Sequence, residues 1–277
     1  MSYGLSYIGS KNKIATKILD ELPSAKNFVD LFAGGCAITH CAILSNKYKQ
    51  FYINDLESIT DLFLDGLKGK YANENRWISR LDFFALKDTD PYVKYCWSFG
   101  NNGKDYLYSE EIEPFKKTYW ELCFSNDPHE KRLLIKELIK QASQQNRVNT
   151  NLESLGRLER LQSLECLERL KTLTDNIVST HDDYTQVLIQ PHSVVYCDPP
   201  YLNTSQPYQG KKKFDSEKFY NWVFTQQHLR VGDDVKFYIS EYAMPEDKFR
   251  CVAEFAHTCC SAANTTTKVS ERLFEVE

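Results

Sequence analysis

The chain has 277 residues, 42% of them hydrophobic and 26% charged, which is enough for one large folded domain or for a catalytic domain with an insertion. It has no apolar run near the roughly 18 residues of a membrane span, and its first residues lack the basic and apolar segments of a secretory signal, so we expect a cytoplasmic protein without a membrane partner. The net charge of −4 does not indicate nucleic-acid binding, but a local basic face would be sufficient for it.

Nine cysteines are scattered along the chain without any Cys-x-x-Cys pair. This pattern argues against a zinc site and favours reduced thiols in a reducing compartment. We therefore expect no bound metal.

A helix is predicted to open within Tyr7-Ile8-Gly9-Ser10-Lys11, with Ser10 as its N-cap and an apolar stripe from Ile14 to Leu22. The glycine and the capped helix start leave amide donors, and Lys11 adds a positive charge beside them. Such a site suits a small carboxylate or phosphate. A simple helix cap explains the three residues Gly9-Ser10-Lys11 equally well.

A buried strand is predicted at residues 28–32, followed by the turn Ala33-Gly34-Gly35 and by a helix from about residue 37. This is the first strand–turn–helix unit of a nucleotide-binding sheet, although it is not the full G-x-G-x-x-G fingerprint. A second strand at 50–53 ends in Asn54-Asp55. Asp55 is placed to bond ribose hydroxyls, to cap the next helix, or to do both.

Residues 65–173 interrupt the alternation of strands and helices. A loop at Trp97–Gly103 is followed by predicted helices at about 109–124 and from Asp127-Pro128 onward. The polar tract 141–151 carries side chains that can contact base edges, or it is a solvated loop. Leucine then recurs at every third position from 152 to 173, a period that does not keep to one helix face, and its conformation is left open.

The α/β pattern returns at about residue 174. Asp183-Tyr184 could lie at a strand end near the purine of a cofactor, or begin an ordinary helix. The strand Ser193–Cys197 runs into Asp198-Pro199-Pro200-Tyr201. Its two prolines fix two φ angles and remove two backbone donors, so the loop is stiff.

An acid, a free carbonyl and an aromatic ring at a strand end suit the alkylation of an amino group on a planar base. The Asp198 carboxylate and the Pro199 carbonyl can hold both hydrogens of an adenine amino group, which favours the pyramidal nitrogen that attacks a methyl group, while Tyr201 stacks on the base. The same four residues also mark ordinary turns.

Beyond this loop, Lys211-Lys212-Lys213 is either a basic patch for DNA or a solvated lysine run. A helix is predicted from Ser216 to about Leu229 and a strand at 236–240. We expect a last strand at 272–276 to be antiparallel and to close the edge of the sheet.

Four separated segments resemble the Dam-type adenine-N6 DNA methyltransferases of phages and restriction–modification systems. They are Tyr7–Lys11, Phe28–Gly35, Ile53–Asp55 and Asp198–Tyr201, in the order of that family, and Glu271–Phe274 is similar to its closing strand. The resemblance implies an α/β, Rossmann-like S-adenosylmethionine-dependent methyltransferase sheet with one reversed strand. It implies a catalytic domain at 1–64 and 174–277 and a mainly helical target-recognition insertion at 65–173.

The same resemblance implies roles for single residues. The catalytic set is Asp198, Pro199, Pro200 and Tyr201. The residues around S-adenosyl-L-methionine are Tyr7 and Lys11 at its methionine end, Asp30, Ala33, Gly34 and Gly35 at the turn, Asp55 at the ribose, and Asp183 and Tyr184 beside the adenine. The residues expected to contact double-stranded DNA are Asn101, Asn102, Gln145, Arg147, Asn149, Lys211, Lys212 and Lys213.

Two features depart from the family pattern: Gly9-Ser10-Lys11 replaces the commoner Gly-Gly-Lys, and the leucine repeat has no counterpart in compact members. The expected enzyme is bacterial or phage-encoded, a monomer or weak dimer, with a cognate restriction endonuclease as a candidate partner. It would flip its target adenine out of the duplex. The rivals are methylation of RNA or of a protein amide, for which Asn-Pro-Pro-Tyr is more typical, and a non-catalytic DNA-binding or cofactor-sensing protein.

Overall fold

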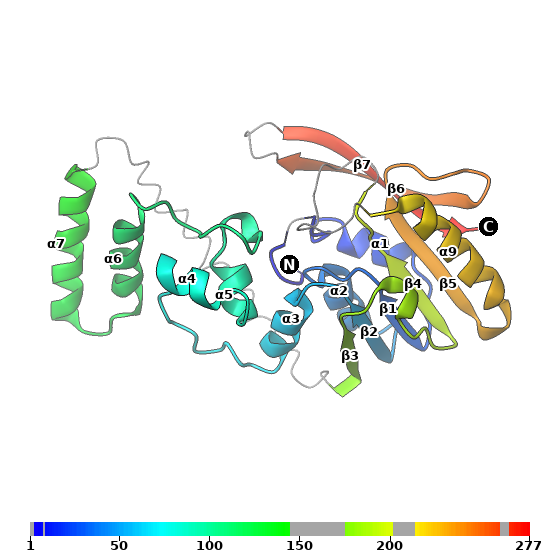
Figure 1. Ribbon diagram of the computed structural model, residues 1–277, viewed down its shortest axis with the longest axis horizontal. Coiled ribbons are helices and arrows are strands. Elements are labelled where there is room, and N and C mark those ends of the chain that lie inside the picture. The colour runs from blue at the N-terminus through cyan, green and yellow to red at the C-terminus, as the bar shows by residue number, and fades with distance from the viewer. Residues whose placement is uncertain (1–2, 8, 145–174, 202–213, 261–265) are drawn as a thin grey trace.

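A seven-stranded mixed sheet forms the centre of the computed structural model, which describes residues 3–7, 9–144, 175–201, 214–260 and 266–277 (Figure 1). The strand order is β3-β2-β1-β4-β5-β7-β6. The strands are β1 (Asn27–Asp30), β2 (Gln50–Asn54), β3 (Ile177–Thr180), β4 (Ser193–Cys197), β5 (Val235–Glu241), β6 (Phe249–Cys260) and β7 (Thr266–Val276). Strands β1 to β5 are parallel, and β7 is antiparallel to β5. The predicted Rossmann-like sheet with one reversed strand near its end is confirmed.

The last strand does not close the sheet, so that expectation was wrong. Strand β7 lies between β5 and β6, and β6, which the sequence did not predict, forms the edge. A bulge between Cys251 and Ala253 explains why β6 was missed. Phe249 and Phe255 are an even number of residues apart, yet they belong to the cores on opposite faces, because the extra residue breaks the two-residue alternation.

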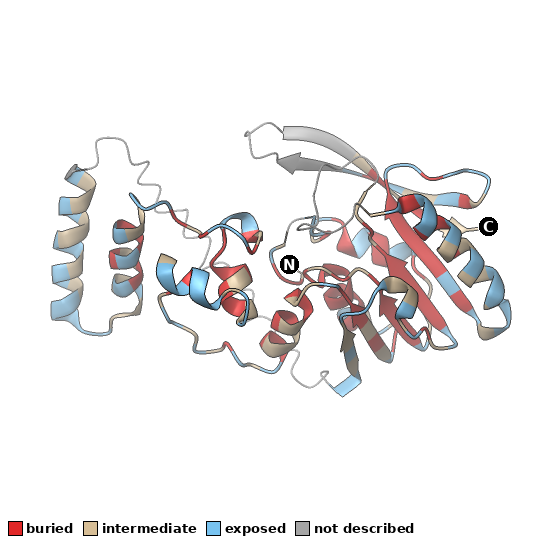
Figure 2. Cartoon of the chain, viewed as in Figure 1, coloured by how far each residue is buried: buried red, intermediate tan, exposed pale blue. Residues whose placement is uncertain are grey.

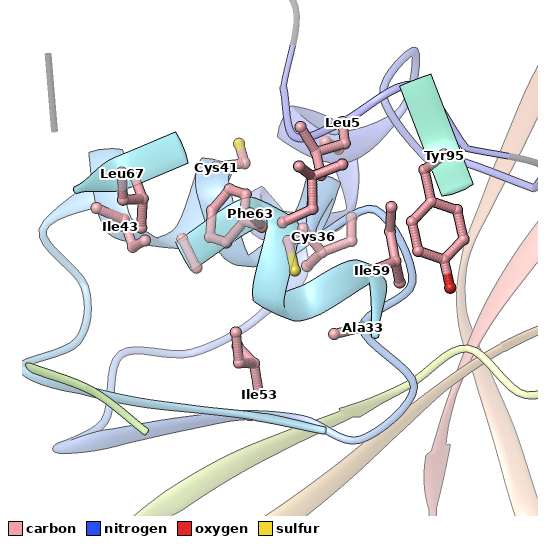
Figure 3. Close-up of a cluster of buried hydrophobic side chains, with 14 of the residues drawn as sticks. Leu5, Ala33, Cys36, Cys41, Ile43, Ile53, Ile59, Phe63, Leu67 and Tyr95 are labelled. Atoms are coloured by element: carbon pink, nitrogen blue, oxygen red, sulfur yellow. The ribbon is translucent and has the colours of Figure 1, made fainter. Parts of the chain in front are cut away.

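Alternating side chains of the strands build two separate cores. On one face Phe28, Val194 and Tyr196 pack against the helices α1 (Ala15–Glu21), α2 (Ala37–Ser45) and α3 (Ile59–Leu67). Figure 3 shows part of this cluster, where Phe63 of α3 lies among side chains of α2 and of the turn after β1. On the other face Val29 and Val195 pack against α9 (Ser216–Leu229), whose predicted bounds are confirmed. Both faces of the central strands are therefore buried (Figure 2).

Helix α3 packs on the sheet, and the other four α-helices described between β2 and β3 stand to one side of it (Figure 1). They are α4 (Arg80–Leu86), α5 (Pro91–Cys96), α6 (Glu113–Phe124) and α7 (Pro128–Gln144). In the described part of this region the only extended pairing is one bridge between Ser98 and Tyr106. Helix α7 begins at the predicted proline, and its residues 128–143 contain no buried side chain. The tract 145–151 and the leucine repeat lie outside the described residues, and the bounds of the insertion remain a prediction.

The N-terminal helix begins later than the sequence predicted. It starts at Ala15, and Ile14 at the N-cap position makes no side-chain capping bond. Ser10 is therefore not the cap; its amide donates to the Tyr7 carbonyl in a preceding turn, at 3.1 Å. No described helix is both long enough and apolar enough to cross a bilayer.

The segment before this helix packs directly on the glycine turn after β1. The Leu5 amide donates to the Gly35 carbonyl at 2.7 Å, and the Gly4 amide donates to Nδ1 of His40 at 2.8 Å. Burial lowers the pKa of His40 to about 4, so its ring is neutral and can accept this bond at ordinary pH. A Cβ on Gly4 would lie 2.4 Å from the Gly35 carbonyl oxygen. The segment around Gly4 and Leu5, here called the N-terminal strap, and the glycine turn after β1 therefore form one packed unit.

Replacing Gly4 by alanine tests this contact. Gly4 has a φ of +64° in addition to the clash, so Gly4→Ala should lower the free energy of unfolding by about 3 kcal/mol. Thermal or urea unfolding measures it. Gly232→Ala is the matched control, because no atom lies within 4 Å of its added Cβ. Equal stability of the two variants would show that the strap does not pack as described.

Candidate active site

The site forms where β1 and β4 end side by side. These strands are parallel neighbours in which Asp30 pairs with Tyr196, and the Leu31 amide donates to the Tyr196 carbonyl at 2.9 Å. The loops that follow, 31–36 and 198–201, therefore leave the same edge of the sheet. In open α/β sheets this carboxyl edge is where ligands bind.

Asp55 holds the glycine turn. Its two oxygens accept the amides of Gly34 and Glu57, each at 2.9 Å. Burial raises the pKa of Asp55, and the two amide bonds oppose that shift. The alternative that Asp55 caps a helix is not supported, because α3 begins at Ile59 with Ser58 before it. The carboxylate instead joins the end of β2 to the turn after β1.

Asn54 joins three strand ends, a role that the sequence analysis missed. Its Nδ2 donates to the carbonyls of Leu31 and Asp182, at 3.2 and 3.0 Å, and its Oδ1 accepts from the Thr180 hydroxyl at 2.7 Å. Asn54 is only 3% exposed and must find such partners, and the signal available in the sequence was an amide side chain directly after the hydrophobic run 50–53. The loops after β1, β2 and β3 are thereby tied together.

Asp30 lies beneath the turn with its side chain closed off from solvent. It is 1% exposed and accepts a 2.6 Å hydrogen bond from the Thr39 hydroxyl. Burial raises the pKa of Asp30 to about 7; the Thr39 bond opposes this, and the neighbouring Asp198 and Asp55 add to it. Asp30 therefore supports the turn from inside.

The Asp198 carboxylate forms a largely buried ion pair with Lys11. The Lys11 ammonium lies 2.7 Å from Oδ2 of Asp198 and 3.6 Å from Oε1 of Glu271, a residue of β7, and it also donates to the Gly9 carbonyl at 3.2 Å. Burial raises the pKa of Asp198, and Lys11 counteracts this. Burial would lower the pKa of Lys11, but Asp198 and Glu271 together raise it. The lysine is therefore charged, and residues from three distant segments meet at one cation.

Tyr201 completes this group of side chains. The Lys11 ammonium lies 4.8 Å from the centre of its ring, within the range of a cation–π contact. The Tyr242 ring meets the Tyr201 ring edge to face at 4.7 Å. The loop thus presents an acid and a supported aromatic ring together, as the sequence predicted, whereas the pairing of Lys11 with Asp198 was not foreseen.

Comparison with known proteins identifies the family of a chain that has this glycine turn and Asp-Pro-Pro-Tyr loop. A family model described as "D12 class N6 adenine-specific DNA methyltransferase" matches residues 7–242. The chain belongs to this family. The predicted resemblance to adenine-N6 DNA methyltransferases is thereby confirmed.

Individual proteins match this D12 class chain over a short segment or at low sequence identity. It is 37% identical over 90 residues to the type II methyltransferase M.CviAII of Paramecium bursaria Chlorella virus 1, a match that covers 30% of this chain and only 27% of the viral protein. Two solved structures are similar over most of their length. They are yhhF of Escherichia coli, provisionally assigned as a methyltransferase (12% identity, TM-score 0.36, covering 100% of this chain and 91% of that one), and HI0767 of Haemophilus influenzae, provisionally assigned as a methylase (13%, 0.31, 95% and 94%). These TM-scores are too low to show a common fold, so the fold is assigned from the strand order of the sheet.

An aromatic cluster borders the D12 class site on the side of β3. The ring of Tyr184 lies 5.9 Å from Phe32, 6.1 Å from Phe214 and 5.1 Å from Trp222. Asp183 accepts bonds from the amide and the hydroxyl of Thr185, at 3.0 and 2.6 Å. The two residues follow β3, a strand of the same sheet, and they also begin a short 3-10 helix, η3 (Tyr184–Gln186), with Asp183 as its N-cap, so the structure combines the two placements that the sequence left open. The sequence analysis placed Phe32 in the strand 28–32, whereas β1 ends at Asp30 and the ring of Phe32 contacts Tyr184 from the loop that follows.

The Tyr7 ring packs against the glycine turn. The Tyr7 ring meets the Tyr95 ring at 6.1 Å, and a Cβ on Gly34 would lie 3.2 Å from it. A Cβ on Gly35 would lie 2.6 Å from the Leu5 carbonyl oxygen. The residues expected around the cofactor thus lie near the carboxyl edge of the sheet, except that Lys11 points to Asp198 of the Asp-Pro-Pro-Tyr loop.

The structure describes only two of the residues expected to contact DNA. Asn101 is 6% exposed and its Nδ2 donates to the Ser6 carbonyl, so it shapes the loop and its predicted contact with DNA is not supported. Asn102 donates to Asp105 at 2.8 Å and accepts two backbone amides within the same loop. Its contact with DNA remains a prediction. The others, Gln145, Arg147, Asn149, Lys211, Lys212 and Lys213, lie outside the described residues.

No group of three or more histidine, cysteine or carboxylate side chains in the described ranges is arranged to hold a metal ion. The acids at the carboxyl edge instead accept hydrogen bonds from amides, from a hydroxyl and from Lys11.

The unusual pKa of Asp30 has a consequence for stability. The folded protein binds the Asp30 proton more tightly than the unfolded chain, so stability should fall as pH rises from about 4 to about 7. Asp30→Asn removes the titrating carboxyl group. It should therefore reduce the loss of unfolding free energy between pH 4 and pH 7 by about 4 kcal/mol. Urea unfolding at several pH values measures the difference, and an unchanged slope would contradict the shift.

Proposed function

We propose that this chain is a site-specific DNA methyltransferase that transfers a methyl group from S-adenosyl-L-methionine to N6 of an adenine in double-stranded DNA. The observation that carries the proposal is the position of Asp198-Pro199-Pro200-Tyr201. The loop follows β4, next to the glycine turn held by Asp55, in a chain whose family is defined by adenine-N6 methylation.

The residues at the carboxyl edge of β1 fit S-adenosylmethionine, which supplies an electrophilic methyl group when bound. Gly34, with a φ of +46°, has no side chain between the backbone of the turn and a ligand, and the buried Asp55 is an acceptor suited to ribose hydroxyls. Tyr184 and Phe32 provide apolar rings suited to a purine. Ala33 and Gly35 belong to the same turn, Asp30 supports it from below, and Asp183 lies next to Tyr184.

The catalytic loop would recognise the adenine by its amino group and its ring. The Asp198 carboxylate and the Pro199 carbonyl accept the two amino hydrogens, and Pro200 keeps the loop stiff. The Tyr201 ring, held by Tyr242, stacks on the base. Positioning and a fixed negative charge are the main contributions of the protein. A base inside a duplex cannot reach this loop, so the adenine must be extruded, at a cost of a few kcal/mol.

The region 65–173 and the lysines 211–213 are the parts of the chain that we assign to the DNA duplex. The fold of the region supports this, because it adds helices beside the sheet without extending it. Gln145, Arg147 and Asn149 would contact the target site, and a restriction endonuclease that cuts the same site would be the natural cellular partner. We place the enzyme in the cytoplasm of a bacterium or of a phage-infected cell.

Replacing the acid of the loop tests the proposal. Asp198→Ala should reduce methyl transfer to DNA by about 1,000-fold or more, because it removes an acceptor that holds the reacting amine, while cofactor affinity changes little. Mass spectrometry of N6-methyladenine in treated DNA measures the loss, with RNA and protein as parallel substrates. Asp247→Ala, at an exposed carboxylate, is the matched control. Normal methylation by Asp198→Ala, or transfer by the unaltered chain to RNA or protein alone, would refute the assignment.

A further inference from the structure

The Lys11 ammonium contacts both groups that the target adenine would bind, the Asp198 carboxylate and the Tyr201 ring. It is 2.7 Å from the Asp198 carboxylate, which must accept the amino group, and it is 4.8 Å from the centre of the Tyr201 ring, on which the base must stack. A base stacked on the ring face that the ammonium covers would need the space of this cation. On the proposed function, the adenine and Lys11 therefore compete for the same loop.

A displaced lysine needs another partner, because an unpaired charge in a buried site is costly. The Lys11 side chain is 10% exposed and the Glu271 side chain 3%. Glu271 is already 3.6 Å from the ammonium, so a small displacement toward β7 would make a close ion pair. Glu271 also interacts with the Tyr201 hydroxyl, so the two carboxylates and the ring form one connected group.

The strand fixes Glu271 in this position. It pairs with Phe255 of β6, and the alternation of side chains along β7 turns it toward the site while its neighbour Arg272 faces outward to Glu254 at 3.4 Å. A carboxylate on a regular strand is held more precisely than one on a loop. Glu271 is therefore a rigid acceptor next to a cation that sits on the end of a long side chain.

We propose that Glu271 is a positioning residue that takes over the Lys11 ammonium when the extruded adenine engages Asp198. The exchange keeps one cation between two carboxylates throughout. With Lys11 on Asp198 the loop is closed to the base, and with Lys11 on Glu271 the acid and the ring are available. This inference depends on the proposed function, since the adenine is the competing group.

Glu271→Gln tests the exchange because it keeps the shape and removes the charge. With only Asp198 left as a charged partner, Lys11 should stay there, and kcat/KM for DNA should fall about tenfold to 100-fold, with cofactor affinity within about twofold of normal. Methyl transfer to DNA whose modified adenine has been mapped by sequencing measures the first value, and titration calorimetry the second. Glu254→Gln, an exposed carboxylate on β6, is the matched control and should stay near normal.

A purely structural role for Glu271 is separated by a double-mutant cycle with Lys11→Met. Extrusion is followed by 2-aminopurine placed beside the target adenine, which needs no catalysis. Glu271→Gln should reduce the fluorescence rise when Lys11 is present and leave it unchanged in the Lys11→Met background. An equal reduction in both backgrounds, or normal activity of Glu271→Gln, would overturn the exchange alone. Absence of transfer by the unaltered chain would overturn the proposed function together with it.

Discussion

The parallel pairing of β1 with β4 is the constraint on which the site depends. Asp30 is opposite Tyr196, so the glycine turn and the Asp-Pro-Pro-Tyr loop leave the sheet as neighbours although about 165 residues separate them. A slip of one residue would turn Val29 and Val195 from one core to the other, so burial on both faces enforces this register. The position of the two loops is therefore a consequence of hydrophobic packing, and their chemistry is added to it.

Buried polar side chains then set the shape of the site. Asn54 and Asp55 bind the backbone of three loops, Asp30 is closed by Thr39, and Lys11 neutralises Asp198. Asn54, Asp55, Asp30 and Lys11 are buried, Asp198 is largely buried, and each has a partner, which is the condition for a polar network to stabilise one conformation. Several acids at one edge would repel each other. Burial is the first cause of the raised pKa values of Asp30, Asp55 and Asp198, and neighbouring acids add to the shift at Asp30 and Asp55.

Local patterns predicted much of this arrangement. The hydrophobic runs at 28–32, 50–53 and 236–240 gave three strands of the sheet, and the helical pattern from Ser216 to Leu229 matched α9 in full. Where prediction failed, a contact distant in sequence was responsible. Ser10 does not cap α1 because the chain turns inward to place Lys11 on Asp198, and β6 was missed because its bulge breaks the alternation. Asn101 resembled a base-reading amide but is used to hold Ser6.

The amino-acid sequence by itself determined the chemical inventory: a stiff Asp-Pro-Pro-Tyr loop, a glycine turn, an acid after the second strand, and the order of these elements in a parallel sheet. Short-range rules suffice for these features, because proline, glycine and hydrophobic alternation act on neighbouring residues. Only the tertiary structure decided that β7 lies inside the sheet and that Glu271 meets Lys11 and Asp198 there. Three segments far apart in the chain meet at that point, and no local pattern specifies which buried charges will share a space once the strands have paired.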